Sequence, residues 1–146
     1  MGDSENRFEM SYREVPGIEE AFTKAKVVLL TTFGGGEEHT RQMTNLNEGL
    51  TDPIWFPTER DTRKVRDIQE NSKVLITFPA QEEGSYYELE GEASLAPQEE
   101  VMDKWQWWWL YWHPTQRMRF WFPPIPDGRR AIINVKPLSA RLVKKD

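Results

Sequence analysis

The stretch WFPTERDTRKVRDIQENSKVLITF, residues 55–78, predicts a strand, a helix and a second strand in close succession. Its start belongs to the short apolar run IWFPT, residues 54–58, which we expect to be a strand. In the charged segment that follows, the apolar residues Val65 and Ile68 are three apart, which is the spacing of a helix. Asp61 or Thr62 can cap the start of that helix. The apolar, β-branched run KVLITFP, residues 73–79, is typical of a buried strand.

Segments on both sides of this stretch predict further strands and helices. The expected strands are KVVLLTTF (26–33), HTRQMTNL (39–46), SYYELEGEASLA (85–96), AIINVKP (131–137) and SARLVKK (139–145). Two further helices are predicted in GIEEAFTKAK (17–26) and QEEVMDKWQWWWLYW (98–112). Gly34-Gly35-Gly36 marks a hairpin turn between the first two of these strands. We therefore expect six or seven mostly antiparallel strands with two or three helices, a mainly β barrel over residues 17–146 after a flexible leader at 1–16.

Composition excludes several classes of function. The chain has 146 residues and a net charge of −5, which fits a single domain and argues against bulk nucleic-acid binding. It has no cysteine and only two histidines, so we expect no metal site. No stretch is long and apolar enough to span a membrane, and the polar N-terminus has no secretory pattern. We therefore expect a cytoplasmic protein.

Two polar segments are candidates for binding. In Thr58–Lys64 the helix start offers free backbone N–H groups, two threonine hydroxyls and the adjacent Arg63-Lys64 pair, which together suit a phosphate. The same residues also fit a capped surface helix with solvated charges. The second segment, residues 41–44, places Arg, Gln and Thr inside a strand, where they line a pocket or form the polar face of an edge strand. Trp55-Phe56 would flank such a pocket or fill the core.

Taken in order, these segments resemble the split β-barrel flavoproteins related to pyridoxamine 5'-phosphate oxidase, and among them the general-stress-protein branch. The resemblance rests on the succession RQM, WFPTERDTRKVRDIQENSKVLITF, YYELEGEASL, DKW, FPPIPDG and the final Val135-Lys136-Pro137. It covers roughly residues 15 to 140, nearly the whole chain.

The resemblance implies a Greek-key-like split barrel that binds flavin mononucleotide (FMN). The implied cofactor-binding residues are Arg41, Gln42, Met43, Thr44, Trp55, Phe56, Thr58, Thr62, Arg63 and Lys64. Among them, Thr62, Arg63 and Lys64 would hold the phosphate. The family pairs two subunits barrel to barrel with the flavin at the interface, which implies a homodimer. Trp108, Trp112 and Trp121 are then candidates for the wall that a partner subunit contributes.

The tail PLSARLVKKD lacks the Arg-x-His pair with which the oxidase holds pyridoxal phosphate, so we do not expect true pyridoxamine 5'-phosphate oxidase activity. The expected function is that of a flavin-dependent oxidoreductase acting on an unidentified small molecule. Two alternatives stay open: a deazaflavin, haem or a nucleotide in the same cleft, and a non-enzymatic binding or stress protein of the same fold. The tryptophans recurring at helical spacing after residue 104 fit buried packing first and an aromatic box for a flat ligand second.

Overall fold

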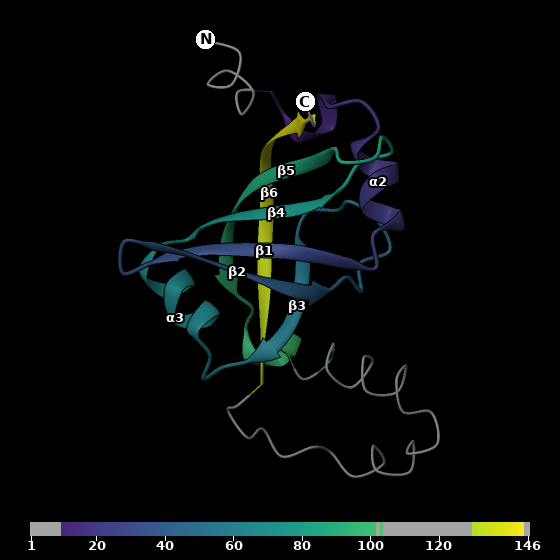
Figure 1. Ribbon diagram of the computed structural model, residues 1–146. Coiled ribbons are helices and arrows are strands. Elements are labelled where there is room, and N and C mark those ends of the chain that lie inside the picture. Colours follow the sequence, from purple (N-terminus) through teal and green to yellow (C-terminus); the bar gives the residue numbers. More distant parts are fainter. Residues whose placement is uncertain (1–9, 102, 104–129, 145–146) are drawn as a thin grey trace.

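Six strands form one antiparallel sheet in the computed structural model, which describes residues 10–101, 103 and 130–144. The strands are β1 (Val27–Gly34), β2 (Glu37–Thr44), β3 (Ile54–Glu59), β4 (Lys73–Pro79), β5 (Tyr86–Leu95) and β6 (Arg130–Val143). Among the helices are η2 (Tyr12–Glu14), α2 (Ile18–Lys24) and α3 (Arg63–Glu70). Residues 98–101 and 103, within the helix predicted over 98–112, are helical as well, and the rest of that predicted helix lies outside the described residues. The strand order β2-β1-β4-β5-β6-β3 makes β2 and β3 the two edges of a strongly curled sheet (Figure 1). This confirms the expected mainly β, mostly antiparallel split barrel with two or three helices.

A short hairpin fixes which face of β2 each side chain occupies. Gly35 and Gly36 form the whole β1–β2 turn with φ of +62° and +77°, a conformation that glycine adopts without a steric penalty. The turn sets Arg41 opposite Leu30 and so places it on the inner, core-facing side of the curl. Gln42, the next residue, is exposed on the outer side.

The loop after β2 is tied to the start of β3, which brings the two sheet edges together. Asn47 is buried, accepts the backbone N–H of Trp55 at 3.0 Å and donates to the Trp55 carbonyl at 2.9 Å. Asn45 in turn accepts the backbone N–H of Asn47 at 3.1 Å. These bonds satisfy backbone groups that an edge strand would otherwise leave to water.

The core lies inside the curl, with α2 packed beside β4 and α3 beside the β1–β2 hairpin (Figure 1). Phe22 of α2 meets Phe78 of β4 edge to face at 5.3 Å between ring centroids. Residues 11–15, part of the expected leader, also contribute to the core. Tyr12 and Val15 are buried in this core because η2 packs on β6.

One expectation about the C-terminal strands is wrong. Residues 131–137 and 139–145 were expected to be two strands, whereas β6 runs unbroken over 14 residues between β5 and β3. Pro137 does not end the strand, because the β5–β6 register shifts there: Gly91 faces Pro137 and Glu90 faces Ser139, which leaves Leu138 unpaired. Such an irregularity tolerates a residue without a backbone N–H.

Candidate functional site

The start of α3 presents backbone N–H groups that its N-cap side chain leaves free. Thr62 is the N-cap, with extended φ and ψ of −134° and 159°, which confirms the predicted helix start. Its hydroxyl donates backwards to the Glu59 carbonyl at 3.0 Å and does not bond to the N–H groups of the first turn. These groups and the helix dipole remain available for an anion.

Three cations gather near this helix start, and we call Arg41, Arg63 and Lys64 the cation cluster. Burial lowers the pKa of Lys64, the charge of Arg41 lowers it further, and Glu59 opposes both. Burial likewise lowers the pKa of Arg41, while Asp67 opposes that shift and Arg63 adds to it. Among the described residues, no carboxylate lies within 4.0 Å of the charged groups of Arg41 or Lys64. The cluster therefore carries repulsion that a bound anion would relieve.

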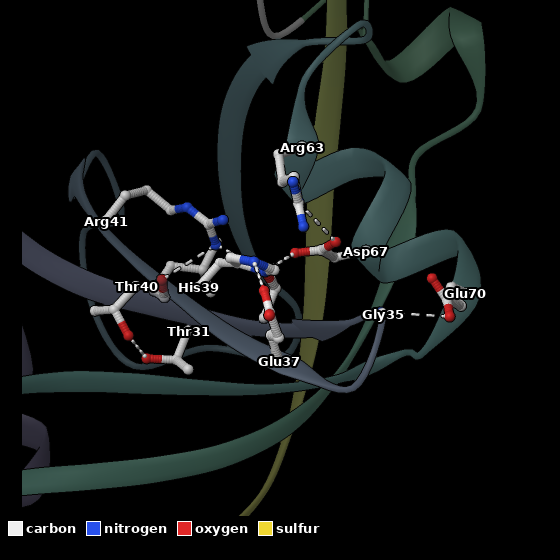
Figure 2. A network of polar contacts seen from close by, with 11 residues as sticks. Thr31, Gly35, Glu37, His39, Thr40, Arg41, Arg63, Asp67 and Glu70 are labelled. Atoms are coloured by element: carbon white, nitrogen blue, oxygen red, sulfur yellow. Dashed lines mark hydrogen bonds and ion pairs between the residues drawn. The ribbon is translucent and has the colours of Figure 1, made fainter.

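A buried carboxylate lies next to Arg63 of the cluster, as Figure 2 shows. Asp67 of α3 is 4% exposed, and its Oδ2 accepts the Thr32 hydroxyl at 2.7 Å and faces His39 Nδ1 at 2.9 Å. Its Oδ1 lies 3.8 Å from Nε of Arg63, one helical turn earlier. Thr32 also accepts a hydrogen bond from Arg41 at 2.8 Å. The carboxylate is thus connected to cations from both α3 and β2.

The electrostatic balance keeps Asp67 ionised. Burial disfavours its charged form, but hydrogen bonds from Thr32 and His39 and the charges of His39 and Arg63 outweigh burial and hold the pKa of Asp67 below its ordinary value. Strand β1 also makes room for this group: a Cβ on Gly34 would collide with the Asp67 carboxyl. The network was not anticipated from the sequence. The available indication was an aspartate between Val65 and Ile68, the two apolar residues of the buried helix face.

The remaining predicted site residues are distributed over different surfaces. Phe56 is fully buried in the core, and Met43 and Thr58 are 9% and 7% exposed. Gln42 and Thr44 are exposed on the outer side of β2, so their side chains do not join the cation cluster on the inner side. Any contact of Phe56 with a ligand would go through its backbone.

Trp55 lies on the other face of β3 from Phe56. It is half-buried against Ala96, Val101 and Ile132. It also lines a cavity of about 410 Å³ beside the loop that follows β2. Trp108, Trp112 and Trp121 lie outside the described residues.

The described residues contain neither a cluster of metal ligands nor a membrane-spanning helix. Within residues 10–101, 103 and 130–144, no three His, Cys, Asp or Glu side chains converge as metal ligands. In the same part of the chain, no helix has the length and apolar character needed to cross a bilayer.

Comparison with known proteins identifies similar chains. The family model described as pyridoxamine 5'-phosphate oxidase like matches residues 14–141. General stress protein 26 of Bacillus subtilis (strain 168) is 31% identical over 121 residues, which cover 81% of this chain and 79% of that protein.

Solved structures share the fold at lower identity. General stress protein 26 from Bacillus anthracis str. Sterne superimposes with a TM-score of 0.61 at 18% identity, covering 87% of this chain and 91% of that one. A pyridoxamine 5'-phosphate oxidase-related, FMN binding protein from Nostoc punctiforme gives 0.58 at 18% identity, covering 80% and 73%. Other structures of this fold are described as an F420 reductase and as a FAD-binding protein from Mesorhizobium loti.

Proposed function

Because the chain belongs to the pyridoxamine 5'-phosphate oxidase-like family, we propose that it binds FMN with the phosphate at the cation cluster. The observation that carries this proposal is the convergence of Arg41 and Lys64, two half-buried cations with no carboxylate in ion-pair range among the described residues. Arg63 and the uncapped N–H groups after Thr62 complete a donor set that suits a phosphate dianion.

The rest of the flavin would lie along the two edge strands. The outer edge of β2 faces no other strand of the sheet, so backbone N–H and C=O groups around residues 41–44 are available to a planar ligand. Trp55 and Thr58 of β3 would contribute from the other edge. An FMN binding protein, a FAD-binding protein and an F420 reductase of similar fold support a flavin-type ligand in general.

When bound, the flavin would supply the redox chemistry for an oxidoreductase acting on a small molecule. The chain would bind the phosphate, orient the ring system and shield it from water. Pyridoxamine 5'-phosphate is not the substrate we propose. The final strand has no Arg-x-His pair, and its Arg141 is engaged with Glu88 at 3.0 Å.

We propose further that the protein is a homodimer formed through the outer face of the sheet. Val27, Leu29 and Tyr86 are 49%, 38% and 38% exposed there, around a groove of about 830 Å³. Exposed apolar residues gathered on one face favour contact with a protein surface. A second copy would bury them next to Gln42 and Thr44.

Titration with FMN and with riboflavin tests the phosphate site, because riboflavin lacks only the phosphate. We expect saturable quenching of flavin fluorescence by the purified protein, with FMN bound far more tightly than riboflavin. The double variant Arg63→Ala/Lys64→Ala should lose about 1.5–3 kcal/mol of FMN affinity for each charged contact removed. Lys24→Ala/Lys26→Ala, which removes the same charge elsewhere, should bind FMN like the unmodified protein. Equal affinity for FMN and riboflavin would refute the phosphate site.

A further inference from the structure

A buried carboxylate on α3 has no evident packing role. Val65 and Ile68 fill the neighbouring positions of the buried helix face with apolar side chains, and Asp67 lies between them at 4% exposure. Removing a carboxylate from water is costly unless charged or hydrogen-bonded partners replace the solvent. Its partners therefore indicate what the group does.

The partners fix the direction of every proton in the network. An ionised carboxylate only accepts hydrogen bonds, so Thr32 must give its single hydroxyl proton to Asp67, and His39 must donate its Nδ1–H. The lone pairs of Thr32 are then free to accept from Arg41, as the 2.8 Å contact requires. Asp67, Thr32 and Arg41 thus form one continuous chain of hydrogen bonds.

The second carboxylate oxygen faces the other cation. Asp67 Oδ1 lies 3.8 Å from Nε of Arg63, whose side chain is 57% exposed and has no other ion pair among the described residues. Gly34 adds an independent indication, since any side chain there would displace the carboxyl group. Strand β1 is therefore shaped around the position of this carboxylate.

We infer that Asp67 is a positioning residue for the anion site, holding Arg63 directly and Arg41 through Thr32. This inference rests on the proposed phosphate site. It makes a prediction that simple charge counting contradicts. Neutralising a carboxylate that interacts with Arg41 and Arg63 would strengthen anion binding if Asp67 acted only through its charge. If Asp67 positions the guanidinium groups, neutralising it weakens anion binding.

The variant Asp67→Asn separates these two effects. The amide oxygen can still accept from Thr32 and His39, while the amide NH2 turns a donor toward Arg63. Glu20→Gln is the matched control, because Glu20 also pairs with a cation four residues away on its own helix, at 2.9 Å from Lys24, but is more than half exposed and lies on α2. We expect Asp67→Asn to weaken FMN binding roughly tenfold and to leave riboflavin binding unchanged, whereas Glu20→Gln stays within about twofold for both.

A double-mutant cycle with Arg63→Gln tests whether the effect passes through Arg63. In the Arg63→Gln background, Asp67→Asn should weaken FMN binding by less than it does in the unmodified protein, because only its effect on Arg41 then remains. Full additivity would show that Asp67 does not act through Arg63 and would overturn the inference. So would FMN affinity in Asp67→Asn that equals or exceeds that of the unmodified protein.

The FMN and riboflavin titrations distinguish failure of the proposed phosphate site from failure of the inference about Asp67. If the unmodified protein does not prefer FMN to riboflavin, the proposed phosphate site fails and this inference fails with it. If it does prefer FMN but Asp67→Asn does not weaken FMN binding, the proposed phosphate site is retained and the positioning role of Asp67 is rejected. Should Asp67→Asn not fold, Thr32→Val removes the link to Arg41 while keeping the carboxylate. A loss of FMN preference over riboflavin in that variant supports the inference, and an unchanged preference overturns it.

Discussion

The substitution Thr32→Val should destabilise the protein far more than the same change at the preceding residue. Thr32 is fully buried, and its hydroxyl donates to the charged Asp67 and accepts from Arg41. Valine has nearly the same shape but leaves both partners without this group. A hydrogen bond to a charged group contributes about 1.5–3 kcal/mol, and the half-buried Arg41 can regain water, so we expect a loss of about 2–3 kcal/mol.

Thr31→Val provides the control on the opposite face of the same strand. Thr31 makes a 2.7 Å hydroxyl contact with Thr40, a neutral pair whose loss should cost about 1 kcal/mol. Urea denaturation measures both differences directly. In thermal unfolding Thr32→Val should lower Tm by between about 4 and 12 °C for a domain of this size.

The pH dependence gives this prediction a second readout. The folded-state pKa of Asp67 is lowered, so its ionised form contributes stability that is fully present above the ordinary aspartate pKa of about 3.9 and is lost as pH falls through the lower folded value. The difference between Thr32→Val and the unmodified protein should therefore be largest near neutral pH and shrink in acid. Equal destabilisation by the two threonine variants at pH 7 would refute the ionised, buried carboxylate.

Three further predictions concern the sheet. Gly34→Ala should cost roughly 1–3 kcal/mol because its methyl group meets the Asp67 carboxyl, while Gly49→Ala, which meets nothing within 4 Å, should leave the urea midpoint nearly unchanged. Asn47→Ala should cost roughly 2 kcal/mol in the same assay, since it removes both hydrogen bonds that tie the loop to β3. Leu29→Glu should convert the proposed dimer to monomer in light scattering with Tm little changed, and a dimer that persists would place the interface elsewhere.

Much of the fold was predictable because local pattern and tertiary environment agree. In β5 the alternation of Tyr87, Leu89, Gly91 and Ala93 with glutamates matches one buried and one wetter face. The start of α3 was likewise predictable, since Thr62 precedes a change of period. The predicted break in the last strand at Pro137 was wrong. The register shift that accommodates this proline depends on the facing strand β5 and cannot be predicted from the sequence around Pro137.

The candidate site was predictable only where its residues adjoin in sequence. Arg63 and Lys64 could be predicted as phosphate ligands because they directly follow the predicted N-cap, Thr62. The contact of Asp67 with Thr32 joins positions 35 residues apart, and no local pattern indicates that they meet. The sequence of β2 also does not show which of Arg41 and Gln42 lies on the inner side of the sheet, because polar residues occur on both faces of this edge strand.

The two-glycine turn between β1 and β2 has a consequence for how the two proposed surfaces evolve. Side chains of β2 alternate between the inner side, where Arg41 meets the network, and the outer side, where Gln42 faces solvent. Inserting one residue beside Gly35-Gly36 would shift the pairing by one position and exchange those two roles. Cofactor retention and self-association would then be lost in a single event, although no residue of either surface had been replaced. The length of this turn therefore couples cofactor retention to self-association, which could otherwise change independently of each other.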